Sequence, residues 1–191
     1  SVLPNHMPKL FDTLNEKFTH HLILKCDKKN FDEILKVSKD IFNEDKKNNL
    51  LVCSNKESKK LTLNRFVFAG ASARCANISK NANPELLPLD VALKRNDDKW
   101  FHDIPSELKK DVLQTLTVAH FFCLVFHREY VIKIGKNNNK VKDKLLRWFD
   151  EIGAKYPAEH NVGHMYEADD NLKNFYKKLD PNNIFNPGIG K

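Results

Sequence analysis

The sequence lacks several features that would place a protein in a class at once. None of its apolar runs approaches the roughly 18 residues that cross a bilayer as a helix, and its start, Ser1-Val2-Leu3-Pro4, lacks the basic and apolar segments of a signal peptide. It has no internal repeat, no Gly/Ser linker and no phosphate-cradling glycine loop. Its four cysteines form no CxxC pair, which favours buried, reduced thiols over a metal or redox motif. Because it does not begin with methionine, we expect a piece of a longer protein.

The chain does contain a surplus of basic residues. Its 32 Lys and Arg against 25 Asp and Glu give a net charge of +7, whereas residues 156–191 hold 4 basic and 5 acidic groups, net −1. With 41% hydrophobic and 30% charged residues, the composition excludes a disordered chain. A diffuse basic surplus suits a membrane surface, nucleic acid or simply a solvated surface. No RNA-binding aromatic motif, zinc finger or helix-turn-helix signature is evident, so no nucleic-acid partner is expected.

The hydrophobic pattern predicts a mixture of strands and helices. Short apolar runs predict strands at 20–26, 50–53 and 89–93, and one or two long strands within 118–134. Apolar residues at helical spacing, with capping residues, predict helices at 31–42, after Ser54, after Pro105, at 140–152 and at 171–179. This alternation is compatible with a parallel sheet. It fits equally an antiparallel sheet with flanking helices in the ferredoxin-like arrangement, which is an α+β fold.

Histidines are the strongest candidates for chemistry. His120 and His127 bracket an apolar run, and Glu159 directly precedes His160. Two histidines and a carboxylate form a common ligand set for Zn or Mn, and an adjacent Glu and His allow one group to bind metal while the other accepts a proton. In one continuous strand, however, side chains seven residues apart point to opposite faces, so a shared site requires a bulge or turn between His120 and His127. The run between them contains no turn-forming residue.

The C-terminal tail is the second unusual segment. Residues 180–190 hold two turn signals around an apolar pair, and Gly188 and Gly190 permit close approach of the backbone to a flat ligand or another strand. A simple C-terminal turn fits the same pattern.

Four motifs together resemble one family. The strings Leu89–Asp98, His120–His127, Pro157–His164 and Asp180–Lys191 are similar, in order and spacing, to the C-terminal part of the bacterial respiratory FAD-linked D-lactate dehydrogenases. The resemblance covers essentially the whole chain. It implies a cap domain of two ferredoxin-like subdomains at 19–153, with a basic membrane-docking segment near 57–85. It also implies that 1–18 ends a docking region and that 154–191 completes the FAD-binding domain.

The resemblance also implies a reaction and its site. The reaction is oxidation of D-lactate to pyruvate, with electrons passing through FAD to quinone, at the anionic phospholipid surface on the cytoplasmic face of the inner membrane. Most of the FAD site lies in the missing N-terminal part, so the isolated piece is expected to be inactive. Glycolate or 2-hydroxyglutarate is an alternative substrate, and a basic lipid-binding module without catalysis is an alternative function. The implied residues are His160 as base with Glu159, substrate-binding Arg65, His120 and His127, metal-binding His120, His127 and Glu159, and FAD-binding Asn186 and Gly188.

One departure from the family bears on the metal. Relatives place a Gly-rich, acidic turn between the two histidines, where this chain has the apolar run Phe121–Phe126.

Overall fold

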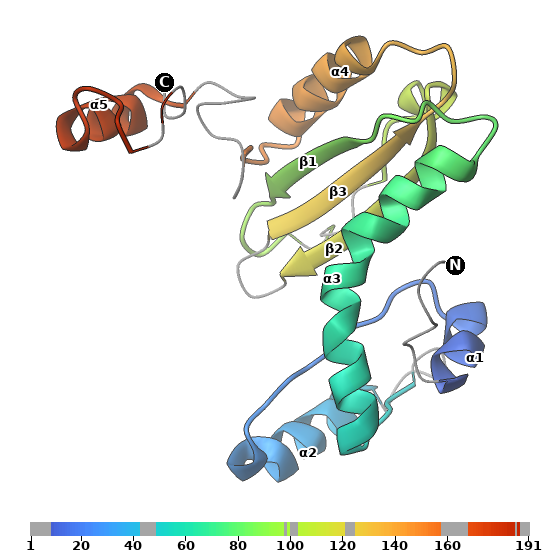
Figure 1. The fold of residues 1–191 in the computed structure, drawn as a ribbon. Coiled ribbons are helices and arrows are strands. Elements are labelled where there is room, and N and C mark those ends of the chain that lie inside the picture. The colour runs from blue at the N-terminus through green and yellow to red at the C-terminus, as the bar shows by residue number, and fades with distance from the viewer. Residues whose placement is uncertain are drawn as a thin grey trace. The chain divides into compact units, whose positions relative to one another are not determined.

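The structure, a computed structural model, describes residues 9–42, 49–97, 99, 103–120, 125–157, 168–185 and 187. The chain divides into two compact units, Ser1–Val67 and Phe68–Lys191, and the long helix α3 (Asn55–Ile78) spans the boundary (Figure 1). Each unit is described by itself.

The described part of the first unit is helical. It contains α1 (Lys9–Lys17), a short 3₁₀ turn η1 (Lys28–Asn30), α2 (Phe31–Phe42) and the start of α3. The helices predicted at 31–42 and after Ser54 are confirmed. Ser54 and Glu57 form a capping box, because the Ser54 backbone N–H donates to Glu57 Oε2 at 2.8 Å and the Glu57 N–H donates to Ser54 Oγ at 3.3 Å. This exchange satisfies donors that the first helical turn leaves without partners.

The strands predicted at 20–26 and 50–53 are wrong. Neither segment belongs to a strand, and the side chains of Leu22, Ile23 and Leu24 are about half exposed. The composition of these runs suits a strand, but a strand also needs a neighbour to pair its backbone groups. No described residue of the first unit supplies that neighbour, so this part of the chain shows no ferredoxin-like sheet.

The second unit contains a three-stranded antiparallel sheet. Its strands are β1 (Leu87–Ala92), β2 (Val112–His120) and β3 (Val125–Ile132), in the order β1-β3-β2 (Figure 1). The predicted antiparallel sheet with flanking helices is confirmed, and the long apolar region at 118–134 is two strands. The helix predicted after Pro105 is wrong, because only the 3₁₀ turn η2 (Leu108–Lys110) forms there before β2 begins.

Helix α4 (Asn138–Glu151) covers one face of this sheet. It starts where the Asn137 side chain accepts a hydrogen bond from the Lys140 N–H, and the chain leaves it at Gly153, whose φ of +67° favours glycine. The apolar side of α4 packs on alternate residues of β1 and β3, and this is the main core. Its fully buried members include Leu89, Val91, Phe126, Tyr130, Ile132, Leu145 and Phe149.

The last turns of α3 lie against the opposite face. Cys75 and Ala76 pack with Val131 of β3 and Leu116 of β2 in a second, smaller cluster.

Helix α5 (Asp170–Leu179) confirms the predicted last helix. It is capped by the Asp169 side chain, which accepts a hydrogen bond from the Leu172 N–H at 3.1 Å. Phe175, Leu179, Ile184 and Phe185 are exposed on or just after α5, so its apolar side has no cover in the described part of the chain.

Asp111, just before β2, should make stability depend on pH. Its carboxylate lies 2.9 Å from Lys136 Nζ and 3.0 Å from Lys144 Nζ, and hydrogen bonds from these two lysines hold the pKa of Asp111 below its usual value. A lowered folded-state pKa stabilises the protein above the unfolded pKa of about 3.9, and that stabilisation is lost as the pH falls through the folded value. Because both amines are nearly half exposed, Asp111→Asn should lower the free energy of unfolding by only about 1 kcal/mol at pH 7. Urea unfolding from pH 7 to pH 3 should show that difference constant down to about pH 5 and shrinking below pH 4; a pH-independent difference would contradict the assignment.

Candidate functional site

The β2–β3 hairpin brings His120 and His127 together. Val118 lies opposite His127 in the antiparallel register, and Val118 and His120 are two residues apart on β2, so both histidines lie on the same face of the sheet. Their ring centroids are 5.0 Å apart and the ring planes meet at 87°. The single continuous strand that would separate them does not form, because the chain reverses direction between β2 and β3.

Asp90 joins this pair from the third strand. It lies directly opposite His127 in the β1–β3 register, and its Oδ1 is 2.7 Å from His127 Nδ1. The two side chains are 12% and 20% exposed. No role for Asp90 was predicted from the sequence. The sequence does contain one indication of its position. Asp90 lies between Leu89 and Val91, so in a strand it lies on the opposite face from these buried apolar residues.

Glu129 is a further carboxylate on the same face. It lies two residues after His127 on β3, is only 9% exposed, and its Oε2 has no hydrogen-bond partner within the described ranges. A buried carboxylate oxygen without a donor costs free energy. This face therefore holds a buried acceptor without a donor in the described part of the chain, next to the cluster that the last turns of α3 form on it.

Two of the three predicted metal ligands, His120 and His127, lie among the described residues. Among the described residues, no group of three or more His, Cys, Asp and Glu side chains gathers as a metal site. The donor chemistry still suits a metal such as Zn, because metal-binding histidines commonly hold a carboxylate through their second ring nitrogen, as His127 does. The third predicted ligand, Glu159, lies outside the described residues, so the Zn or Mn site stays a prediction.

The other predicted site residues are not brought into this geometry. His160, Glu159, Asn186 and Gly188 lie outside the described residues. The backbone of Arg65 is part of α3 in the first unit, and its side chain is not described.

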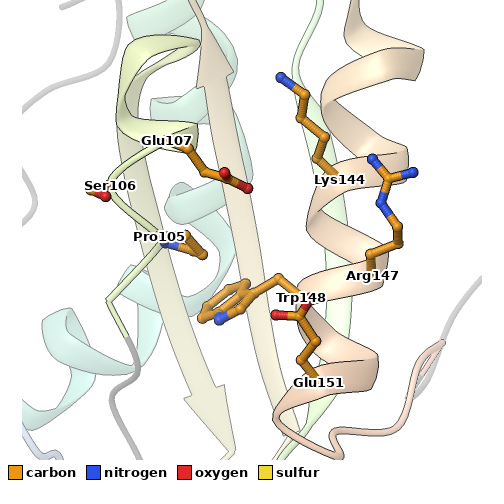
Figure 2. Close-up of a pocket in the computed structure, with 7 residues that line it drawn as sticks. All are labelled: Pro105, Ser106, Glu107, Lys144, Arg147, Trp148 and Glu151. Carbon is orange, nitrogen blue, oxygen red and sulfur yellow. The ribbon is translucent and has the colours of Figure 1, made fainter.

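A hollow on the α4 side of the sheet does not coincide with the histidines. Figure 2 shows it between the turn at 105–107 and one side of α4. Two cations and two carboxylates line it, so it presents no single charge to a ligand. None of the predicted site residues is among its lining side chains, which are Pro105, Ser106, Glu107, Lys144, Arg147, Trp148 and Glu151.

The α4 side also buries one charge as part of the core. The Arg128 guanidinium is 5.8 Å from the ring centre of Phe126 and 5.6 Å from that of Trp148, and the residue is 2% exposed. Burial raises the pKa of the neighbouring Tyr130 phenol, an effect that the charge of Arg128 opposes. Because β3 alternates, Arg128 and Tyr130 lie on the opposite face from His127.

The structure thus defines an α+β protein whose antiparallel sheet has an apolar core on one face and paired histidines with two carboxylates on the other. No helix in the described ranges has the length and apolar character to cross a membrane. A family model described as "D-lactate dehydrogenase, membrane binding" matches residues 1–191, and the chain belongs to this family.

Three curated relatives match the chain along its whole length, and each is named quinone-dependent D-lactate dehydrogenase. The relative from Haemophilus influenzae is 40% identical over 189 residues, which is 99% of this chain. The relatives from Escherichia coli and Corynebacterium glutamicum are each 37% identical over 100% of the chain. The matched regions are 33–34% of these relatives, so the chain spans about a third of their length.

Proposed function

We propose that this chain is part of an enzyme that oxidises D-lactate to pyruvate and passes the electrons through FAD to quinone. One observation carries the proposal: the three relatives, all named for this activity, match the entire chain at 37–40% identity. FAD would supply the acceptor for the hydride that leaves the carbon bearing the hydroxyl.

The proposed roles of the residues follow from their chemistry. The His160 imidazole accepts the hydroxyl proton, because histidine titrates near neutral pH, and Glu159 lies beside it. His120 and His127 bind the substrate, or a Zn or Mn ion together with Glu159, and their shared face supports a joint role. Arg65 pairs with the substrate carboxylate. Asn186 and Gly188 contact FAD.

The activity is tested with the purified enzyme that contains this chain. Reduction of a soluble quinone by D-lactate is compared with reduction by L-lactate, glycolate and D-2-hydroxyglutarate. The proposal requires the highest kcat/KM with D-lactate. A higher value with glycolate or 2-hydroxyglutarate would reassign the substrate, and no reduction with any of them would reject the function.

Two features support a place for this chain within a larger fold. The uncovered apolar side of α5, with Phe175 and Leu179, suits packing of residues 154–191 against an FAD-binding domain. The segments at 20–26 and 50–53 carry exposed apolar side chains, which suits pairing with strands from the part of the relatives that this chain does not span. Residues 19–153 would then belong to the cap domain.

The enzyme would dock on anionic phospholipid at the cytoplasmic face of the inner membrane. The family description names membrane binding, and exposed Lys59 and Arg74 of α3 lie in the basic segment proposed for docking, 57–85. Residues 1–18 would form the end of a second docking region.

Removal of two lysines from α3 should weaken this docking. A lysine near an anionic membrane contributes about 1 kcal/mol, so Lys59→Gln with Lys60→Gln should lower the partition coefficient roughly thirtyfold. Sedimentation with phosphatidylcholine vesicles, with and without phosphatidylglycerol, measures the coefficient at low and high salt. Lys177→Gln with Lys178→Gln in α5 removes the same charge outside the docking segment and should leave binding unchanged. An equal decrease in the partition coefficient for both double variants would contradict the assignment. Binding that does not depend on salt or on anionic lipid would also contradict it.

A further inference from the structure

The α4 side of the sheet encloses a positive charge that no described carboxylate neutralises. Arg128, on the central strand β3, is only 2% exposed, and its Nε and Nη2 have no hydrogen-bond partner in the described part of the chain. Burial of an ion is costly unless an opposite charge accompanies it, so buried guanidinium groups are normally paired. The surroundings of Arg128 indicate the chemistry of the missing partner.

Two aromatic rings stabilise this charge but do not satisfy its donors. The Arg128 guanidinium is 5.8 Å from the ring centre of Phe126 and 5.6 Å from that of Trp148. The face of an aromatic ring attracts a cation, whereas the N–H bonds of a guanidinium lie in its own plane. The rings therefore offset part of the cost of burial and supply no acceptor to Nε or Nη2.

The two nitrogens without partners share one edge of the guanidinium. The Nε–H bond and one N–H bond of Nη2 point the same way along that edge, and this fork matches the two oxygens of a carboxylate. A water molecule would satisfy such donors only in part, and it brings no negative charge. The pattern of unpartnered atoms in Arg128 therefore favours a carboxylate over water.

Tyr130 adds a third donor on the same face of β3. It lies two residues after Arg128, it is fully buried, and its hydroxyl likewise has no partner within the described ranges. Burial raises the pKa of this phenol, and the charge of the nearby Arg128 opposes that effect. The hydroxyl is protonated at neutral pH, so it can donate to an acceptor that also faces the guanidinium.

The hollow beside α4 adjoins this pair of residues. Trp148 lines the hollow, and the same indole ring contacts the guanidinium of Arg128 (Figure 2). The two cations and two carboxylates that line the hollow balance one another, so Arg128 leaves one positive charge in excess. Because Arg128 and Tyr130 are enclosed almost completely, only a small group can reach them.

We propose that Arg128 and Tyr130 form a buried binding site for one carboxylate group, which accepts hydrogen bonds from Nε and Nη2 of Arg128 and from the Tyr130 hydroxyl. The carboxylate belongs to a small free monocarboxylate or to an acidic side chain of the enzyme outside this chain. The site lies on the opposite face of the sheet from His120 and His127, and it does not depend on the proposed oxidation of D-lactate. The alternative is a guanidinium that the two aromatic rings alone hold in the core.

Formate is the probe for this site in the 191-residue chain. Sodium formate replaces sodium chloride at constant ionic strength in a titration of the ¹⁵N-labelled chain, and the Arg128 Nε–H resonance is followed. A hydrogen bond to a carboxylate should move this resonance downfield and to saturation, which gives the Kd. An Nε–H resonance that stays in place would overturn the proposal.

Thermal unfolding of the chain and its variants provides a second readout. At a formate concentration about ten times the Kd, the Tm of the unaltered chain should rise by about 3–6 °C. Arg128→Gln should abolish this rise. Tyr130→Phe removes only the hydroxyl, so it keeps the shape of the core and should raise the Kd for formate about tenfold. An equal rise of Tm in the unaltered chain and in both variants would overturn the proposal.

Arg147→Gln is the matched control. Arg147 lines the hollow on α4, and the substitution removes the same charge without touching the proposed fork. It should leave the Kd for formate unchanged. Formate binding that is lost in Arg147→Gln and kept in Arg128→Gln would place the anion in the hollow and overturn the proposal.

The enzyme that contains this chain distinguishes the two sources of the carboxylate. A free carboxylate site predicts that formate raises the Tm of the enzyme as it raises that of the chain. An acidic side chain from outside this chain predicts that formate has no effect on the enzyme, and that Arg128→Gln lowers the Tm of the enzyme by more than that of the chain. An enzyme with neither response would overturn the proposal, whether or not it oxidises D-lactate.

Discussion

His160→Ala should nearly abolish D-lactate oxidation in the enzyme that contains this chain, while FAD remains bound. The imidazole is proposed to take the hydroxyl proton as hydride leaves the adjacent carbon, and alanine offers no group that accepts a proton. General-base catalysis typically contributes 10²–10⁴-fold, so kcat should fall by about that factor. Steady-state kinetics with a quinone acceptor measure the loss, and the flavin absorbance per protein checks that FAD is retained.

A second histidine substitution controls for unspecific effects. His21 lies in an exposed segment of the first unit and has no proposed role in the chemistry, so His21→Ala should leave kcat and FAD content unchanged. Near-normal turnover in His160→Ala would remove it as the base. Loss of FAD together with activity would indicate that His160 supports the flavin site instead.

Phe149→Ala should cause the largest loss of stability among single substitutions in the second unit. Phe149 is fully buried on α4, and its ring is 5.2 Å from that of Trp148 and 5.8 Å from that of Tyr156. Truncation of a buried phenylalanine removes apolar burial and leaves a cavity, which together cost about 3–5 kcal/mol. Urea unfolding of the chain, followed by circular dichroism, should show a lower midpoint with an unchanged slope.

Leu179→Ala is the control for this loss, because Leu179 is 63% exposed at the end of α5. Its effect on the free energy of unfolding of this chain should stay within about 0.5 kcal/mol. A loss below about 1 kcal/mol in Phe149→Ala would mean that the core between α4 and the sheet is packed more loosely than the structure shows.

Local patterns predicted most of the helices, although the one expected after Pro105 did not form, and they predicted the strands less well. The helix at 31–42 matches α2, and the helix at 140–152 lies within two residues of α4, because apolar spacing and capping groups are properties of consecutive residues. The runs at 20–26 and 50–53 have the composition of strands but no partner in the described first unit. Pairing depends on residues far away in the chain, and a local pattern carries no information about them.

The sequence indicated His120 and His127 as candidates but not the geometry that places them together. The antiparallel pairing of β2 with β3 could not be predicted, because the sequence between the two histidines contains no turn-forming residue. Asp90 was missed because its role depends on the register between β1 and β3, which the alternation within β1 does not reveal. His160, Glu159, Asn186 and Gly188 lie outside the described residues, and the side chain of Arg65 is not described, so the proposed roles of these five stay predictions.

The strand order β1-β3-β2 makes the two histidines unequal in their freedom to move. His127 lies within the central strand, whose backbone is paired on both sides, whereas His120 is the last residue of an outer strand. Amide groups at the end of an outer strand open more often than those in the middle of a sheet. Hydrogen exchange should therefore be slow at His127 and fast at His120, so that a ligand meets one fixed imidazole and one that adjusts to it.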